Sequence, residues 1–232
     1  MENKTPKTKE PQYQCCLDFE KRYGLQTLGL MSSHTWLTDP KRLVFVLSRY
    51  KFVAKMFSGM QKVLEIGCAD AFGTRIVSQE VESLAASDFD PLLIKDAQSR
   101  ITEPYTYQCI THNILEGPLA NNFDGAYALD VIEHISKDNE QLFISNIIKS
   151  VKTDGVVVIG TPSIQSQAYA SPASKEGHVN CKDGNQLKSF LLHFFNNVFI
   201  FSMNDEVIHT GFYPMANYLM ALCCYPKPKF FS

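Results

Sequence analysis

Short apolar runs recur through the middle of the chain and alternate with segments whose apolar residues have helical spacing. Each run is four to eight residues long and is bounded by Gly, Pro, Asn, Asp or Ser, which is typical of β-strands. Two later apolar segments are separated by an Asn204-Asp205 turn and predict an antiparallel pair. The predicted strands cover 63–66, 84–88, 105–110, 123–130, 156–160, 197–203 and 216–224.

The segment 63–74 carries the strongest functional signal. An apolar strand containing Glu65 breaks into a loop of small residues, and an apolar helix is predicted from Arg75 to Val81. Small residues let the backbone approach a ligand closely, and a helix N-terminus presents free amide donors. The glycine and lysine patterns of dinucleotide and P-loop sites are absent, and Glu65 and Asp70 would repel a pyrophosphate. The loop therefore favours a ligand without phosphate, whose cationic or hydroxyl groups Glu65 can bind.

This loop resembles the first motif, E/D-x-G-x-G-x-G, of the class I S-adenosylmethionine (SAM)-dependent methyltransferases. It reads Glu65-Ile66-Gly67-Cys68-Ala69-Asp70-Ala71 here, so alanines replace two of the glycines. The resemblance extends over 55–225 and implies an α/β fold. It also implies a doubly wound, mostly parallel seven-stranded sheet with helices on both faces and an antiparallel C-terminal strand pair. A positive φ at Ala69 would cost roughly 1 kcal/mol relative to glycine.

The resemblance also implies a cofactor, SAM, and the residues around it. Asp88 ends the second strand, at a spacing that suits a ribose-binding carboxylate, and Phe89 beside it is expected against the adenine. For Asn113, a bond from the adenine amino group and a turn-stabilising role are equally compatible with the sequence. The residues expected around SAM are Glu65, Gly67, Cys68, Ala69, Asp88, Phe89, Asn113, Ile114, Asp130 and Val131.

Two histidines are the candidate catalytic residues. Methyl transfer from a sulfonium needs orientation above all, so a general base is optional, and imidazole is the natural base near neutral pH. His134 follows Asp130 and Glu133 at the end of the fourth strand, and His178 lies in a loop that similar enzymes place against their substrate. No metal site is expected. The structural reading is preferred for His193 and His209. His112 is expected behind the residues that contact the adenine, and the role of His34 stays open.

The absence of a motif of another methyltransferase class limits the classes of methyl acceptor. Base N-methyltransferases carry D/N-P-P-Y/F after the fourth strand, where this chain has Asp130-Val131-Ile132-Glu133. The polar segment 163–182 instead favours a hydroxyl of a sugar, sugar nucleotide or glycan precursor as acceptor. The alternatives are an O-, N- or C-methyltransferase for a quinone precursor or other metabolite, a SAM-binding partner subunit without catalysis, and a nicotinamide enzyme.

The first 60 residues divide into two parts. Residues 1–12 are polar and lysine-rich and predict a disordered tail, whereas 13–60 predict a helical lead-in to the SAM-binding domain at 61–225. Helices are expected at 16–23 and from Asp39-Pro40 onward. Between them, 31–38 predicts a loop that either closes over the substrate or is anchored to the core by Trp36.

Composition excludes several classes of protein. A net charge of −2 over 232 residues offers no basic field for nucleic acid or an anionic membrane. No segment has the ~20 apolar residues of a membrane span. The seven cysteines lack metal-ligand spacing, so reduced, buried thiols and a cytoplasmic location are predicted. The predicted partner is a small-molecule or glycan substrate, and a homodimer stays open.

Overall fold

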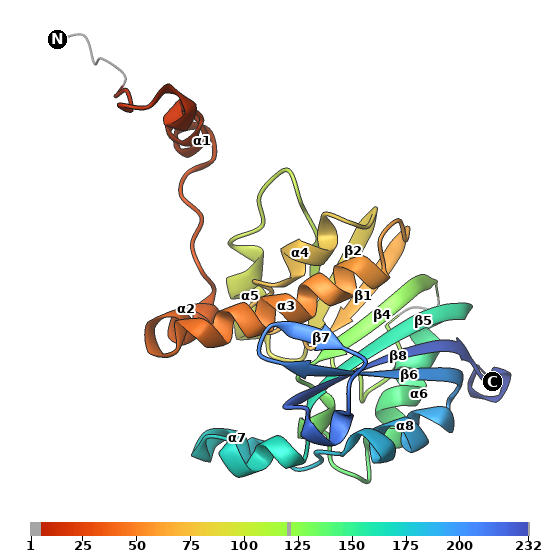
Figure 1. Cartoon of the computed structure of the whole chain (residues 1–232). Helices are drawn as coiled ribbons and strands as arrows, with labels where there is room; N and C mark the ends of the chain where they lie inside the picture. Colours follow the sequence, from red (N-terminus) through yellow and green to blue (C-terminus); the bar gives the residue numbers. More distant parts are fainter. Residues whose placement is uncertain (1–5, 120–121, 232) are drawn as a thin grey trace.

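A computed structural model describes residues 6–119 and 122–231 of the chain. Its centre is a mixed sheet in the order β3-β2-β1-β4-β5-β8-β6-β7 (Figure 1). The first five strands are parallel, and β8 lies antiparallel to both β5 and β6. The strands are β1 (Lys62–Ile66), β2 (Ser83–Asp88), β3 (Gln108–Thr111), β4 (Phe123–Leu129), β5 (Val151–Pro162), β6 (Phe195–Asn204), β7 (Val207–His209) and β8 (Tyr218–Pro226).

The predicted α/β class and its antiparallel C-terminal strands are confirmed, but the sheet has eight strands rather than seven. The additional strand is β7, which pairs with the end of β6 from Ser202↔His209 to Asn204↔Val207. The predicted Asn204-Asp205 turn makes this hairpin, with Asp205 at a φ of 51°. Three residues are too few for periodicity to reveal a strand, which is why the sequence did not predict it.

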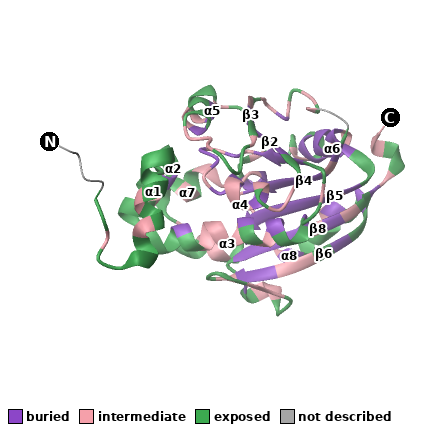
Figure 2. Ribbon diagram, turned by 90° about the horizontal axis from the view of Figure 1, so that it is seen from above, coloured by how far each residue is buried: buried purple, intermediate pink, exposed green. Residues whose placement is uncertain are grey.

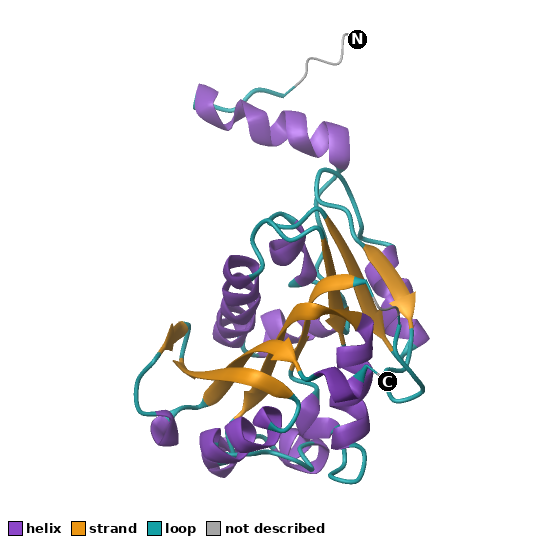
Figure 3. Cartoon of the chain, turned by 90° about the vertical axis from the view of Figure 1, so that its right-hand side faces the viewer, coloured by secondary structure: helices purple, strands orange, loops and turns teal. Residues whose placement is uncertain are grey.

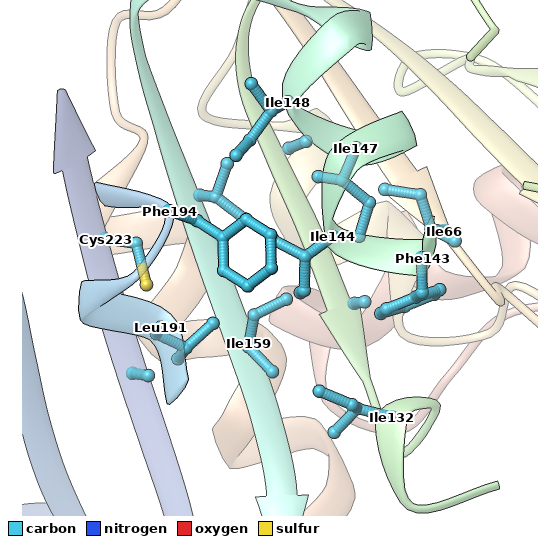
Figure 4. Packing of buried hydrophobic residues seen from close by; sticks show 14 of the residues in the cluster. Ile66, Ile132, Phe143, Ile144, Ile147, Ile148, Ile159, Leu191, Phe194 and Cys223 are labelled. Carbon is cyan, nitrogen blue, oxygen red and sulfur yellow. The ribbon is translucent and has the colours of Figure 1, made fainter. Parts of the chain in front are cut away.

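Helices cover both faces of the sheet. On one face α3 (Pro40–Met56), α4 (Thr74–Ser78) and α5 (Pro91–Gln98) bury residues such as Val53 and Ile94. On the other, α6 (Glu140–Ser150) and α8 (Gly184–Leu192) pack Ile144, Leu191 and neighbouring side chains against Ile159 of β5 (Figure 4). Burial is concentrated in the strands between these two layers (Figure 2).

Side-chain caps define the starts of two helices. Asp90 Oδ1 accepts a hydrogen bond of 2.8 Å from Leu92 N and caps α5. Asp183 forms a capping box with Gln186 at the start of α8. β5 begins before the predicted strand at 156–160 and includes Asp154 and Gly155, and its pairing with β4 shifts register between Phe123 and Gly125. The helix predicted at 75–81 is the shorter α4.

The N-terminal region departs most from the prediction. Helix α1 (Gln14–Tyr23) ends before Gly24 as expected, buries none of its residues and stands apart from the sheet (Figure 3). The predicted loop at 31–38 is a helix, α2 (Leu30–Thr38), and Trp36 is 57% exposed, so it does not anchor this segment. Residues 1–5 of the predicted disordered tail lie outside the described residues, and a short 3-10 helix spans Pro11–Tyr13.

The cysteines, the lengths of the helices and the remaining short elements complete the description of the fold. All seven cysteines are free, but Cys15 and Cys16 are exposed, so the prediction of buried thiols is wrong for this pair. Among the described residues, no helix has the length and apolar character that crossing a bilayer requires. The remaining helix is α7 (Pro172–Gly177), and the other 3-10 helices are Ile132–His134, Gln165–Tyr169, Tyr213–Met215 and Pro228–Phe230.

Candidate active site

A cavity of about 450 Å³ opens where the carboxyl ends of β1, β2 and β4 meet. The strand order reverses between β1 and β4, and ligands of open α/β sheets bind at such a switch point. Eight of the ten residues that the sequence predicts around SAM line this cavity. They are Gly67, Ala69, Asp88, Phe89, Asn113, Ile114, Asp130 and Val131.

The loop after β1 has the backbone that the glycine-poor motif must adopt. Gly67, Ala69 and Ala71 have φ values of 74°, 49° and 52°, so two alanines occupy the left-handed region. A Cβ atom on Gly67 would collide with the side chain of Val131, which explains why glycine is retained there. Position 69 thus has the positive φ whose cost the sequence analysis considered, and the loop carries its strain at the alanines.

Asp88 ties this loop to β2. Its Oδ2 accepts a hydrogen bond of 2.8 Å from Ala69 N, and its Oδ1 accepts one of 2.9 Å from Asp90 N. A carboxylate has about four acceptor positions, so each oxygen keeps one for a ligand. Asp88 thus both shapes the loop and offers the geometry expected of a diol-binding carboxylate.

Glu65 is placed differently from the prediction. It lines neither cavity of the site, because its buried carboxylate accepts hydrogen bonds from Tyr50, Thr74 and Tyr127. Burial raises the pKa of Glu65 to about 7, although the three hydroxyl donors oppose the rise. Its place as a residue that touches the ligand is corrected: it braces β1 against α3, α4 and β4.

The residues on the other side of the cavity have mixed roles. Asn113 Oδ1 accepts a bond of 3.1 Å from Leu115 N, which is the turn-stabilising role, and the side chain still lines the cavity. Phe89 is 73% exposed at the rim. Cys68 faces a neighbouring cavity, and His112, which was expected behind the residues that contact the adenine, lines the first cavity itself.

The neighbouring cavity, of about 300 Å³, continues the site beneath α2 and α3. Both cavities are lined by Asp130 and His134, and His178 lines only the second. The walls combine apolar side chains with a polar end at Arg42, Glu133, His134 and His178. The apolar part includes Met31, Leu43, Val46, Leu47, Phe72 and Leu129.

Arg49 of α3 holds Asp130, and the sequence analysis did not identify it. Its guanidinium lies 2.5 Å from Asp130 Oδ2 and 3.7 Å from the ring centre of Tyr218 in β8. Asp130 has a φ of 57°, an uncommon conformation for aspartate that turns the chain sharply after β4. The only sequence feature that could have indicated this ion pair is an arginine among the apolar residues of the predicted helix. That arginine has no characteristic spacing to Asp130.

The two candidate histidines lie together, with ring centres 5.1 Å apart. His134 Nδ1 lies 2.9 Å from the carbonyl oxygen of Gly177, and His178 Nδ1 lies 2.8 Å from Oε1 of Gln167. Since a carbonyl or amide oxygen can only accept, each Nδ1 carries the hydrogen and each Nε2 is left with a free lone pair. Partial burial, reinforced by His134, lowers the pKa of His178, so its ring is neutral near pH 7.

Glu133 lies behind the histidines and is fully buried. Its Oε2 accepts a hydrogen bond of 3.1 Å from Thr161, whereas Oε1 has no partner among the described residues. Burial, together with the charge of Asp130, raises the pKa of Glu133 to about 8. Its backbone carbonyl accepts bonds from Val179 N and Asn180 N and so fixes the loop that carries His178.

Comparison with known proteins finds a family model that matches the central part of the chain. A family model described as "Methyltransferase domain" matches residues 64–159, which contain β1, the cofactor-side loops, β4 and most of β5. Over this segment, which is less than half of the chain, the protein is similar to the class I SAM-dependent methyltransferases. SAM is the cofactor of this family. The predicted family resemblance and cofactor are confirmed, and so is the α/β class, although the sheet has one strand more than predicted.

Individual similarities are more distant. The chain is 26% identical over 140 residues to the ubiquinone biosynthesis O-methyltransferase of Rickettsia akari, covering 57% of this chain and 52% of that protein. The Rickettsia canadensis protein of the same name is 28% identical over 143 residues, with 56% and 55% covered. The chain thus spans about half the length of the curated relatives it matches.

Solved structures share the fold at low sequence identity. The N-methyltransferase NodS from Bradyrhizobium japonicum WM9, in complex with S-adenosylhomocysteine (SAH), superposes with a TM-score of 0.57. It is 18% identical, with 82% of this chain and 87% of that chain covered. The DhpI–SAH complex superposes with a TM-score of 0.61 at 15% identity, covering 85% of this chain and 92% of that one.

Proposed function

We propose that this chain binds SAM in the cavity beside Asp88 and transfers its methyl group to a hydroxyl of a small phenolic acceptor. The observation that carries the proposal is the continuity of the two cavities, which share Asp130 and His134. SAM in the first cavity, with its ribose at Asp88, would direct its sulfonium methyl toward the second. An acceptor there would lie beside His134 and His178.

The proposed reaction has three parts. The S–CH3 bond of SAM breaks as the O–CH3 bond forms, SAH leaves, and the acceptor hydroxyl loses its proton. The walls must align the acceptor oxygen with the methyl group, which can contribute several kcal/mol. We propose that His178 and His134 act on the acceptor hydroxyl and favour its deprotonation, since their Nε2 atoms are the free basic groups beside it.

The acceptor class follows from the walls and from the relatives. Apolar side chains such as Leu43 and Val46 with a polar end suit a ring that carries hydroxyl groups better than a sugar. The polar residues of 163–182 that favoured a sugar lie outside this cavity, apart from His178, and Tyr169 among them is 90% exposed. The relatives named ubiquinone biosynthesis O-methyltransferases fit the quinone-precursor alternative.

The cofactor half of the proposal is tested by calorimetry with SAM and SAH. The wild-type chain should bind both, and Asp88→Ala should weaken binding at least tenfold, because it removes the proposed ribose acceptor and loosens the Ala69 loop. Asp154→Asn, an exposed carboxylate near the start of β5, is the matched control and should bind like wild type. Absence of binding to the wild-type chain would overturn the proposal.

The acceptor half is tested by measuring SAH release and product mass with two probes, a dihydroxybenzoate and UDP-glucose. Methylation of the dihydroxybenzoate alone supports the phenolic acceptor. Methylation of UDP-glucose alone restores the sugar reading, and tight SAM binding without either product favours a non-catalytic partner subunit. The predicted homodimer and cytoplasmic location stay predictions.

A further inference from the structure

Glu133, His134 and His178 form a cluster in which several acceptor atoms have no hydrogen-bond donor among the described residues. One ligand atom from each side chain lies within 4.8 Å of the corresponding atoms of the other two. Both imidazoles have committed their Nδ1 hydrogens to carbonyl or amide oxygens, so each Nε2 can only accept. Glu133 Oε1 is buried and likewise has no donor among the described residues. When Glu133 is ionised, acceptors thus converge without any hydrogen between them.

The charges around the cluster also favour a bound cation. Glu133 and Asp130 are two carboxylates in a partly dry site, and Arg49 is the one cation that pairs with either of them among the described residues. A guanidinium balances one negative charge, so ionisation of Glu133 beside Asp130 would leave a second negative charge for a metal cation to balance. Buried charges are stable only when they are paired or coordinate a metal.

The outer contacts of the histidines are those of metal ligands. A ligating histidine typically donates its other ring N–H to a carbonyl or carboxylate, which fixes the tautomer and aims the free nitrogen. Gly177 O does this for His134, and Gln167 Oε1 does it for His178. Two imidazoles and one carboxylate favour a first-row transition-metal dication over Mg²⁺ or Ca²⁺, which prefer oxygen ligands.

We propose that Glu133, His134 and His178 bind a divalent transition-metal ion such as Zn²⁺ or Mn²⁺ at the acceptor end of the site. Ligand atoms around such an ion stand about 3.4 Å apart when the metal–ligand bonds are near 2.1 Å. The exposed ring of His134 can close the remaining gap by rotating. This proposal differs from the expectation, from the sequence, of no metal site.

The role of the ion rests on the proposed function. An acceptor hydroxyl that completes the coordination sphere would be oriented toward SAM, and its O–H bond would break more readily, with the proton released to water. The histidines would then favour deprotonation through the metal rather than by receiving the proton themselves. The methyl group would then pass from the sulfonium of SAM to the resulting oxygen, giving the methyl ether and SAH.

The test uses the full chain with any affinity tag removed, stripped with a chelator and titrated with Co²⁺ while visible absorbance is recorded. We expect one ion per chain, displaced by Zn²⁺. His134→Ala, His178→Ala and Glu133→Gln should each weaken Co²⁺ binding by more than about tenfold. His34→Ala, an exposed histidine on α2, is the matched control and should leave binding unchanged.

A second pair of variants leaves all three ligands in place. Gln167→Ala removes the oxygen that orients His178 and should weaken Co²⁺ binding about tenfold, whereas Gln167→Glu keeps an oxygen there and should restore it. This pair remains informative if replacing the buried Glu133 prevents folding.

Two outcomes would overturn the proposal: no Co²⁺ uptake by wild type, or equal uptake by wild type and His178→Ala. SAH calorimetry on the same samples separates this failure from that of the proposed function. SAH binding without Co²⁺ uptake would remove the metal alone, and Co²⁺ uptake without SAH binding would remove the methyltransferase proposal alone.

Discussion

Arg49 and Asp130 form an ion pair of 2.5 Å that joins the middle of α3 to the turn after β4. The two residues are 81 positions apart, and the arginine lies outside the segment 64–159 that matches the methyltransferase family model. The guanidinium also stacks on Tyr218, so one side chain connects α3, β4 and β8. The N-terminal lead-in is therefore part of the active-site framework.

Replacing Arg49 should be costly. Arg49→Met would leave Asp130 without its cation and remove the contact with Tyr218, and we expect a loss of about 3 kcal/mol in the free energy of unfolding. Lys55→Met, an exposed position on the same helix, should change it by less than about 0.5 kcal/mol. Urea denaturation of the three proteins measures both values. Equal stability of Arg49→Met and wild type would show that the pair contributes little.

Gly67 should not tolerate a side chain. Gly67→Ala combines a positive φ with a collision against Val131, so we expect a loss of about 2–4 kcal/mol and of SAH binding. Gly59→Ala is the matched control, since Gly59 has a φ of 84° with no atom within 4 Å of the added Cβ, and it should lose about 1–2 kcal/mol. Val131→Ala should partly rescue Gly67→Ala in a double-mutant cycle. Without rescue, the collision is not the cause.

The sequence predicted those site residues that directly follow a strand of the parallel sheet. Gly67, Asp88 and Asp130 each follow an apolar strand, and parallel strands bring their carboxyl ends to one edge, so the cofactor side could be assembled without a structure. His134 and His178 were identified as candidates for the same reason, because each follows a strand of the parallel set.

What the sequence could not reveal depends on contacts between distant segments. Glu65 precedes the loop as a ligand residue would, yet Tyr50, Thr74 and Tyr127 together take up its carboxylate, and no spacing predicts that. The convergence of Glu133 with His178 depends on the backbone bonds from Val179 and Asn180 to Glu133 O. Helix α2 was missed because its exposed apolar residues lack the one-sided pattern of a helix packed on a core.

Glu65 should make stability depend on pH. The pKa of Glu65 is raised in the folded chain from 4.5 to about 7, chiefly by burial. The protonated carboxyl is the form that the folded chain prefers. Its stabilising contribution is therefore complete below about pH 4.5 and is lost as the pH rises through about 7. The loss amounts to about 3 kcal/mol.

Comparison of wild type with Glu65→Gln isolates this effect from other titrating groups. The difference in free energy of unfolding between the two proteins should change by about 3 kcal/mol in favour of the variant between pH 4.5 and 8. Urea denaturation at several pH values measures the difference. A difference that is independent of pH would mean that Glu65 is ionised in the folded chain throughout this range.

Asp70 should control the opening of α2 over the acceptor cavity. Its carboxylate accepts hydrogen bonds from Ser32 N at 2.7 Å and from Ser32 Oγ at 3.2 Å, and Ser32 is the one buried residue of this helix. Hydrogen bonds to a charged acceptor contribute about 1.5–3 kcal/mol. Asp70→Ala should therefore favour local opening by about 2 kcal/mol, which corresponds to roughly thirtyfold faster amide exchange in α2. Hydrogen–deuterium exchange with mass spectrometry measures this.

Asp39→Ala, at an exposed residue whose side chain does not cap α3, is the control and should leave exchange in α2 unchanged. Unchanged exchange in Asp70→Ala would show that the Ser32 bonds do not hold the helix closed.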